Sequence, residues 1–518
     1  MFRAFRNLTR LFTIARVLAR HDALFLLEDM PVAGSIAGIA QFGAGLSTPK
    51  SLRALRPGQR LAKALERLGP TFIKLGQALS TRPDLVGEAV ASDLAELQDS
   101  LPPFAAATAR AIVAEDLGKP IEAIFSSFDD QPVAAASIAQ VHFAVTLDGD
   151  EVAVKILRPG VVEAFRRDLD MLSWLAELIE AARPSWRRLK PVEAVATFAE
   201  SVRLEMDLRF EAAAAAEMRE NFAGDETFAV PAVDWQRTAQ RVMTLERVHG
   251  IPIDEVERMQ AEGIDVDQVL EKAATAFFNM VFRDGFFHAD MHPGNLFVDH
   301  NGNLIAVDFG ITGRVDQATR RFLAEMLLGF LNGDYRRVAE VHFEAGYVPA
   351  DKSVDHFMQA ARSIAEPILG LPLHEISVAR LLGQLFQVTE TFAMETQPQL
   401  LLLQKSMLVA EGVGRLLNPN LNMWHLARPL IEDWMIGTLG PGARIKTTLS
   451  EVLLSIERLP RLIAEAEKAT GLLGGGLRLH PDTVKVLTGR SAGRKASLLP
   501  GWLPWLAVVA LAVALVLK

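Results

Sequence analysis

The sequence predicts an α+β protein of two lobes, and three observations in chain order support this. Residues 1–125 show mostly helical periodicity. Within residues 137–159, β-rich apolar stretches flank Asp148-Gly149-Asp150, which is the pattern of a β-hairpin. From Ala318 to about Met435 the chain is again helical. A small sheet followed by a mostly helical half is typical of α+β architecture.

Composition limits the kind of protein this can be. At 518 residues the chain exceeds the length at which a single core stops growing, so we expect two or three structural units. The formal net charge of −9 argues against a nucleic-acid partner, because such proteins carry a basic surface. The chain has no cysteine, which excludes disulfides, thiolate metal sites and cysteine nucleophiles.

The segments between the hairpin and the helical half have their own signals. Helical periodicity over residues 161–182 and 195–219 predicts two helices. Residues 240–250 (QRVMTLERVHG) are strand-like, and helices are expected again up to about Arg283. The segment 302–310 (GNLIAVDFG) predicts a turn and a buried strand that ends in Asp-Phe-Gly.

The first twenty residues predict an amphipathic helix. Arginines interrupt every apolar run here, so the uninterrupted core of a signal peptide is missing. The apolar face of the helix comprises Leu11, Phe12, Ile14, Val17 and Leu18. That face either lies on an anionic membrane surface or docks on the rest of the fold, and the sequence favours neither.

The C-terminal segment predicts a membrane anchor. Residues 498–517 contain no charged side chain, over about the 20 residues that a bilayer core requires. Trp502 and Trp505 stand near one end, as in the aromatic belts of membrane spans. Basic residues precede the segment (Arg490, Arg494 and Lys495), and only Lys518 follows it. We therefore expect a single-pass anchor at 498–518 in the inner cell membrane, a cytoplasmic main body, and an amphipathic tether at 441–497.

Four polar residues occur along the chain in an order that is typical of a catalytic site. Lys155 lies on the second strand of the hairpin, Asp290 and Asn295 lie in one loop, and Asp308 ends a strand. Protein kinases use the same parts in the same order for phosphoryl transfer. Asn295 and Asp308 offer the oxygen ligands that Mg²⁺ prefers, and Asp290 can accept a hydroxyl proton. Lys155 would place a positive charge on the phosphates of ATP.

Five motifs together resemble the UbiB family, which comprises atypical protein-kinase-like proteins linked to ubiquinone biosynthesis. They are FIKLGQALSTRPDL (72–85), AAASIAQVH (134–142), EMDLRFEA (205–212), HADMHPGN (288–295) and VDFG (307–310). The resemblance covers roughly residues 20–440 and the terminal anchor. It implies a two-lobed protein-kinase-like fold with an N-terminal helical extension (1–125), an N-lobe (126–250) and a helical C-lobe (251–440).

The resemblance implies how the nucleotide is held. Kinases cover the phosphates with a glycine-rich loop, because glycine allows close approach of the backbone. Here an alanine-rich loop takes its place and restrains ordinary kinase activity, and the Ser137 hydroxyl could reach a phosphate. This loop consists of Val133, Ala134, Ala135, Ala136, Ser137 and Ile138. Without the lysine that follows, the start of a helix made of small residues would be the favoured interpretation of this segment. The segment TLERVHG resembles the hinge between kinase lobes, so the backbone of Glu246 and Val248 should bind adenine.

The resemblance also assigns partners to two lysines. Lys74 and Gln77 share one face of a helix, and the family places both in the active site, where the extension covers the groove for a peptide. Glu205 is the expected partner of Lys74, and Glu211 that of Lys155. We expect both acids on one helix, with Asp207 on the same face as Glu211 and with Glu205 on a different face. The alternative is that they are exposed acids on a helix surface.

The loop HADMHPGN would carry the catalytic Asp290, with Pro293-Gly294 forming its turn. His288 takes the place of the histidine that supports this loop in kinases, and the resemblance puts His292 beside Asp290. A His-Asp-His metal site is the alternative.

The expected function is that of an ATP-binding, Mg²⁺-dependent atypical kinase or ATPase at the membrane that supports ubiquinone biosynthesis. Phosphoryl transfer would go to water or to a small or lipid acceptor rather than to a protein. Expected partners are ATP and ADP, membrane lipid, quinone precursors and ubiquinone-biosynthesis enzymes. The alternative is a non-catalytic pseudokinase scaffold that organises those enzymes. Direct hydroxylation finds no support, because no Gly-x-Gly-x-x-Gly fingerprint follows a strand.

Overall fold

A computed structural model describes most of the first 439 residues. The described residues are 2–24, 52, 54–80, 86–95, 97, 101–182, 191–368, 384, 387–389, 391–394, 398–420 and 423–439. The chain divides into two compact units, Met1–Gly437 and Thr438–Lys518. The predicted tether (441–497) and membrane anchor (498–518) lie outside the described residues. Among the helices that the structure describes, none combines the length and apolar composition needed to cross a membrane.

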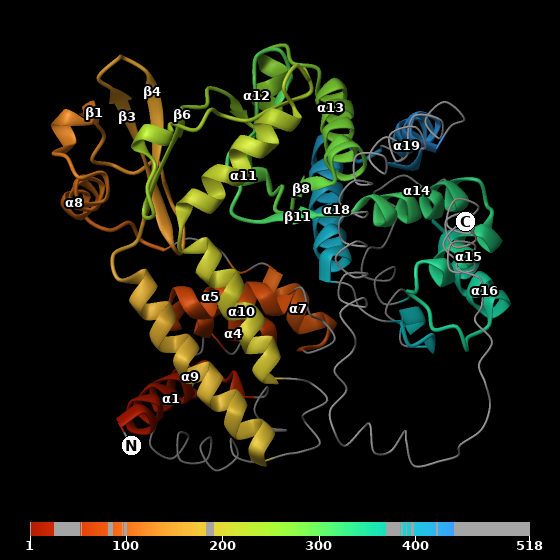
Figure 1. The fold of residues 1–518 in the computed structure, drawn as a ribbon, viewed down its shortest axis with the longest axis horizontal. Helices are drawn as coiled ribbons and strands as arrows, with labels where there is room; N and C mark the ends of the chain where they lie inside the picture. Colours follow the sequence, from red (N-terminus) through yellow and green to blue (C-terminus); the bar gives the residue numbers. More distant parts are fainter. Residues whose placement is uncertain are drawn as a thin grey trace, which may run out of the picture. The chain divides into compact units, whose positions relative to one another are not determined.

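The N-terminal extension is a helical layer with its own core. It contains α1 (Phe2–Arg20), α4 (Pro57–Leu68), α5 (Pro70–Ser80) and α7 (Glu88–Ala95). Prolines begin α4 and α5, where a missing N–H costs nothing. A Cβ on Gly76 would lie 2.7 Å from Leu65 Cδ1, so glycine allows α5 to pack closely on α4. Helix α9 (Val161–Ala182) contacts α1 and α5, and α10 (Pro191–Glu205) lies alongside α9 (Figure 1).

The apolar face of α1 docks on this layer. Ile14 is buried in the core of the extension, and Leu11, Val17 and Leu18 pack against the same core. Phe12 is 47% exposed. Arg10 adds a fork of two hydrogen bonds, 2.8 and 2.9 Å long, to the carboxylate of Asp168 on α9. Of the two sequence-based alternatives for this helix, docking on the fold is the one observed.

The N-lobe is built on an antiparallel sheet. Its strands run in the order β1 (Phe125–Phe128), β3 (Ala139–Thr146), β4 (Glu151–Leu157) and β6 (Val242–Glu246), and β2 (Ala134–Ala135) pairs with β3. The predicted hairpin is confirmed, with Gly149 at φ 97° in its turn. Helix α8 (Ala106–Leu117) covers the face of the sheet that carries Val152, Val154 and Ile156. Alternation along β4 therefore turns Lys155 to the opposite face. Because α8 packs on this sheet, we group it with the N-lobe rather than with the extension.

The acidic segment 205–211 does not lie on one helix. Helix α10 ends at Glu205, and α11 (Leu208–Asn221) begins three residues later. Asp207 is the N-cap of α11, with φ −130° and a side chain that accepts a hydrogen bond from the Arg209 amide at 3.2 Å. The predicted helix 195–219 is therefore wrong in its continuity, because the capping aspartate takes extended backbone and ends the preceding helix.

The C-lobe combines short strands with helices. Strands β5 (Phe228–Ala229), β10 (Leu304–Ala306), β9 (Leu296–Val298) and β7 (Ile251–Pro252) form one sheet, and β8 (Phe286–His288) pairs with β11 (Thr312–Arg314). The helices are α12 (Val256–Ala261), α13 (Val266–Phe278), α14 (Gln317–Leu331), α15 (Tyr335–Glu344), α16 (Val354–Ala365), α18 (Pro398–Leu417) and α19 (Met423–Leu439). A π-helical turn, Asn279–Asp284, connects α13 to β8. The predicted helical half is confirmed for these described helices.

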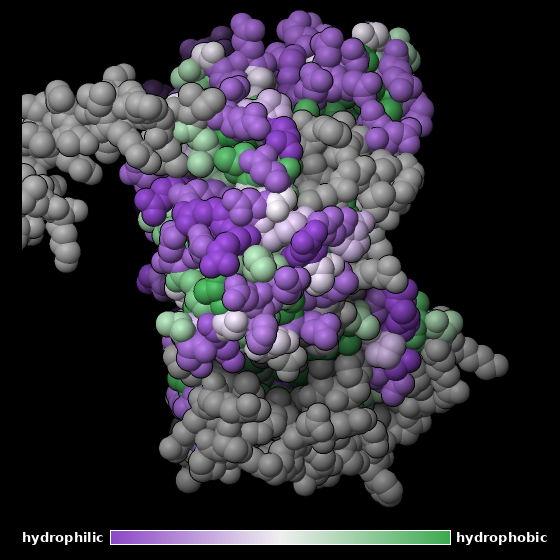
Figure 2. Space-filling view, turned by 90° about the vertical axis from the view of Figure 1, so that its right-hand side faces the viewer, coloured by the Kyte–Doolittle hydropathy of each residue, from purple (hydrophilic) through white to green (hydrophobic). Residues whose placement is uncertain are grey.

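One face of the molecule is shown in Figure 2. Hydrophilic side chains cover most of its described part, and apolar ones occur singly or in small groups between them. Scattered apolar residues of this kind are normal on a protein surface and mark no particular interface.

Candidate active site

The centre of the site is a lysine shared by two carboxylates. Lys155 Nζ lies 2.6 Å from Glu211 Oε1 and 3.0 Å from Asp308 Oδ2. The three side chains come from β4, from α11 and from the segment after β10. The Gly310 amide donates to Asp308 Oδ1 at 3.0 Å and holds that carboxylate in place. The structure thus brings together three of the residues that the sequence predicted to meet.

The two carboxylates have opposite pKa shifts. Burial raises the pKa of Glu211 to about 7 against the opposing charge of Lys155, and the Glu211 side chain is only 8% exposed. For Asp308, partial burial acts to raise the pKa, but the charge of Lys155 and the Gly310 N–H outweigh it and lower the pKa to about 2. Asp308 is 42% exposed, so the anion faces accessible space. Burial alone would lower the pKa of Lys155, yet the two carboxylates raise it well above its usual range.

Asn295 and Asp308 lie at the same end of a hairpin. Asn295 directly precedes β9 and Asp308 follows β10, and the two strands pair antiparallel with Leu296 opposite Ala306. The Val307 amide donates to the Asn295 carbonyl at 3.1 Å. Asn295 Nδ2 donates to the Asp290 carbonyl at 3.0 Å, and its Oδ1 accepts no hydrogen bond from any described residue. A free amide oxygen next to an anionic carboxylate fits Mg²⁺, which takes oxygen ligands and completes its shell with phosphate and water.

The two histidines of the loop have structural contacts. His288 Nδ1 accepts from the Asp290 amide at 3.1 Å, and its ring lies 5.2 Å from that of Phe309. Burial lowers the pKa of His288, so the ring is neutral. His292 Nδ1 accepts from the Gly294 amide at 3.2 Å. Within the described residues no group of three or more His, Asp or Glu side chains is placed to hold a metal ion, so these residues do not form the alternative His-Asp-His site.

The extension reaches the same region through Lys74. Lys74 Nζ lies 3.0 Å from Glu205 Oε2, which joins α5 to the end of α10. Its charge also contributes to the lowered pKa of Asp308. Gln77 accepts a hydrogen bond only at its backbone carbonyl, from Ser80, and its side-chain amide bonds to none of the described residues. The structure therefore brings Lys74 and Glu205 together but does not join Gln77 to the other site residues.

The alanine-rich loop is a strand and a turn, not a helix start. The Val133 amide donates to the Val141 carbonyl at 2.8 Å, and Ala134–Ala135 continue that pairing with β3. The Ala136 amide then donates to the Ala139 carbonyl at 2.8 Å. This turn leaves Ala134 exposed but buries Ser137 completely and Ile138 almost completely. The expectation that the Ser137 hydroxyl faces a phosphate is wrong for this structure, because the turn directs that side chain inward.

The predicted hinge follows β6. The Glu246 amide already donates to the Ala232 carbonyl at 2.8 Å, so only the Glu246 carbonyl remains for adenine. The Val248 amide donates no backbone hydrogen bond to the described residues. Adenine binding by these two backbone groups stays a prediction.

Comparisons with known proteins agree with this geometry. Residues 96–342 match the ABC1 atypical kinase-like domain, and residues 361–422 match the UbiB helical domain. The chain is 42% identical over 462 residues to "Probable protein kinase UbiB" of Marinobacter nauticus, covering 88% of this chain and 84% of that protein. The proteins of the same name from Aeromonas salmonicida and Aeromonas hydrophila are 40% identical over 464 residues, with the same coverage. This chain belongs to the UbiB family.

A solved structure agrees with the kinase-like α+β fold of the family. The complex of Rv3197 with erythromycin from Mycobacterium tuberculosis is 27% identical to this chain with a TM-score of 0.50. The similarity covers 69% of this chain and 91% of that one. A family model and a structural relative therefore both support the assignment of kinase-like lobes.

One residue of the UbiB helical domain joins the site without having been predicted. Lys405 Nζ on α18 lies 3.1 Å from Asp290 Oδ1. The sequence does contain a weak signal for it. Lys405 interrupts the apolar run LLLLQKSMLV and shares a helix stripe with Leu402 and Val409, three and four residues away. A lysine on such a stripe favours an acidic partner, but the sequence does not say which one.

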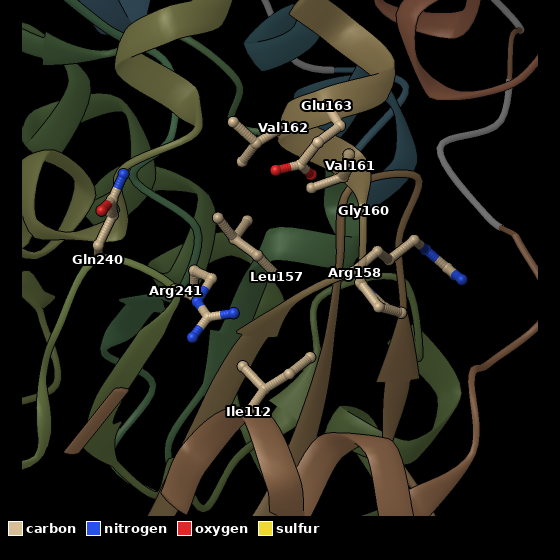
Figure 3. A pocket seen from close by; sticks show the side chains of 10 residues that line it. Ile112, Leu157, Arg158, Gly160, Val161, Val162, Glu163, Gln240 and Arg241 are labelled. Carbon is tan, nitrogen blue, oxygen red and sulfur yellow. The ribbon is translucent and has the colours of Figure 1, made fainter. Parts of the chain in front are cut away.

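A cavity of about 210 Å³ lies elsewhere in the N-lobe, between α8 and the start of α9 (Figure 3). It contains none of the predicted site residues. The cations in its wall are already engaged: Arg241 bonds Asp116 at 2.7 Å, and Arg158 donates to the carbonyls of Leu101, Pro102 and Ala136. Arg158 thereby fixes the alanine-rich loop to the segment before α8.

Proposed function

We propose that this UbiB-family chain binds Mg²⁺ and ATP and transfers a phosphoryl group to water or to a small or lipid acceptor, in support of ubiquinone biosynthesis at the membrane. The observation that carries the proposal is the meeting of Lys155 with Glu211 and Asp308. Glu211 and Asp308 are 56 and 153 residues from Lys155 in sequence, and their meeting at one lysine is the arrangement that supports phosphoryl transfer.

Each site residue has a distinct part in this proposal. Asp308 and the Asn295 Oδ1 atom would hold Mg²⁺, which neutralises phosphate charge when bound. Lys155 would leave Asp308 for the phosphates and keep Glu211 as its partner. The Asp290 carboxylate would orient the acceptor hydroxyl and take its proton. The Glu246 carbonyl and Val248 amide would hold adenine.

The extension supports a small acceptor rather than a peptide. The Lys74–Glu205 pair ties α5 to the end of α10, and the charge of Lys74 acts on Asp308, as expected if the extension covers the groove that a peptide would occupy in a kinase. Quinone precursors and lipids are small at their reactive end and reside in the membrane. The segment 498–518, which carries no charge before its last residue, Lys518, would anchor the chain there from the cytoplasmic side, close to other enzymes of ubiquinone biosynthesis.

The test is ATP turnover by the full chain in vesicles of anionic lipid, with and without a phenolic quinone precursor. We expect release of phosphate or formation of a phosphorylated lipid that either addition stimulates. Asp308→Asn and Asp290→Asn should each lower turnover by at least about 100-fold. Exposed Asp130→Asn, in the N-lobe, serves as the matched control and should turn over normally. Undiminished turnover in both site variants would contradict the proposal.

The alternative function is a nucleotide-binding scaffold. It is favoured by one observation, namely that Glu211, Asp308 and Asp290 are all paired with lysines in this structure, as a non-catalytic site would also allow. Expression of Asp290→Asn in a quinone-deficient strain separates the two functions. A scaffold restores quinone synthesis with this variant, and an enzyme does not.

A further inference from the structure

We propose that Lys405 of the helical domain is a positioning residue for Asp290. The inference rests on the proposed phosphoryl transfer and adds to it a cation that lies outside the matched kinase-like domain, residues 96–342. Lys405 belongs to the segment matched by the UbiB helical domain, residues 361–422. The helical domain would then complete the active site and not merely support it.

The position of Lys405 is set by the packing of α18. Leu403, Val413 and Leu417 of this helix are buried in the main core of the C-lobe. Ser406, the next residue after Lys405, is completely buried and donates to the Leu402 carbonyl. A helix anchored on both sides of Lys405 holds its Cα in one place. The lysine side chain is 30% exposed, so much of its stem packs on protein.

The contact uses one carboxylate oxygen and leaves the other available. Lys405 Nζ lies 3.1 Å from Asp290 Oδ1, and Asp290 is its sole ion-pair partner among the described residues. Asp290 Oδ2 accepts no hydrogen bond from the described part of the chain. The Asp290 backbone is fixed on both sides, by His288 at its amide and by Asn295 at its carbonyl. Lys405 therefore restrains the side-chain torsions of Asp290, which these backbone contacts leave free.

The chemistry explains what this orientation does. As the acceptor oxygen forms its bond to the γ-phosphorus, the bond from that phosphorus to the β,γ-bridging oxygen breaks and its electron pair leaves with ADP. The acceptor proton moves to Asp290 Oδ2. Lys405 holds Oδ1 and so keeps Oδ2 directed at the acceptor, next to the negative charge that is being transferred. Holding a base in the reactive orientation accelerates the chemical step more than it strengthens nucleotide binding.

The test compares Lys405→Met and Lys405→Arg in the full chain. We expect Lys405→Met to lower kcat for ATP by about 10- to 100-fold while KM for ATP and the affinity for Mg·ATP change by no more than about 3-fold. Lys405→Arg keeps the cation and should recover most of kcat. Lys63→Met is the matched control, since Lys63 forms a comparable pair with Glu66 at 2.8 Å on the exposed surface of α4. A general loss of folding would instead lower the melting temperature and spoil nucleotide binding.

A double-mutant cycle with Asp290→Asn completes the test. If Lys405 acts through Asp290, adding Lys405→Met to Asp290→Asn costs no further turnover, and the two changes are also non-additive in melting temperature. Wild-type kcat in Lys405→Met, or losses that multiply in the double variant, would overturn the role of Lys405 alone. A wild-type chain that turns over no ATP overturns the proposed function, and this inference with it.

Discussion

Two lysine–glutamate pairs lie in the same part of the molecule and differ in what else they touch. Lys155 lies 2.6 Å from Glu211, and Lys74 lies 3.0 Å from Glu205. All four side chains are largely buried. The first pair has a third member, Asp308, at 3.0 Å from Lys155. The second joins the extension helix α5 to the end of α10.

The difference indicates two separate roles for similar chemistry. In the first pair, Lys155 also contacts Asp308, the carboxylate that we propose as a metal ligand. Lys155 can therefore exchange Asp308 for the phosphates when nucleotide binds. The second pair joins α5 to the end of α10, and Lys74 is the sole ion-pair partner of Glu205 among the described residues. We therefore expect turnover to depend on Lys155 and the closure of the extension to depend on Lys74.

The largest effect should come from Lys155→Met. Without this cation, Glu211 and Asp308 lose the positive charge that they share, and the phosphates lose their contact. We expect turnover to fall by about 1,000-fold or more and nucleotide affinity to fall with it. Phosphate release and a nucleotide titration measure the two effects. Lys74→Met is the paired comparison, and an equal loss of nucleotide affinity in both variants would remove the distinction between the pairs.

The pH dependence of the free energy of unfolding should distinguish the Lys155–Glu211 pair from the Lys74–Glu205 pair. The pKa of Glu211 is about 7 in the folded protein against 4.5 as its ordinary value, so the folded state holds a proton that the unfolded state releases between these values. Stability therefore falls as the pH rises through this window, by up to about 3 kcal/mol in total. Glu211→Gln cannot titrate and should show a flatter profile.

The measurement is chemical denaturation of wild type and Glu211→Gln from pH 4.5 to 8. The difference between their free energies of unfolding should decrease as the pH rises to 7 and level off above it. A difference that increases with pH would mean that Lys155 dominates over burial and holds Glu211 ionised. Glu205→Gln in the second pair is the comparison for the same protocol.

Local patterns in the sequence predicted much of this fold. The hairpin at Gly149 and the helix at 161–182 were both predicted, because turn chemistry and helical periodicity are local signals. The meeting of Lys155 with Asp308 followed from the order of motifs, although the two are 153 residues apart. Their roles in catalysis stay predictions.

The failures have physical causes that periodicity does not record. The break occurs at Asp207 because its side chain caps the start of α11. That cap competes with continuation of the preceding helix. The burial of Ser137 depends on which way a two-residue strand turns. Lys405 reaches Asp290 across 115 residues, and no pattern in a single helix names its partner. In each case tertiary packing selects one of several arrangements that the local sequence allows.

Breaking the second pair should affect stability more than chemistry. Lys74→Met leaves Glu205, a largely buried carboxylate, without its cation. We expect a loss of about 2 kcal/mol in the free energy of unfolding, seen as a lower denaturation midpoint, and less than a 10-fold change in turnover. The double variant Lys74→Met/Glu205→Gln removes the unpaired charge and should regain part of the loss. A double variant as unstable as the sum of its parts would show that the two residues are not coupled.

The smallest effect concerns the helix break that separates the two glutamates. Asp207→Ala removes the N-cap of α11 and should cost about 1 kcal/mol, whereas Asp207→Asn preserves a capping oxygen and should cost less. The exposed ion pair with Arg209 is lost in both variants and contributes little. Thermal melting of the two variants measures the cap. Equal melting temperatures would mean that the buried side chains of Met206 and Leu208, not the cap, set the turn that sends Glu205 to Lys74 and Glu211 to Lys155.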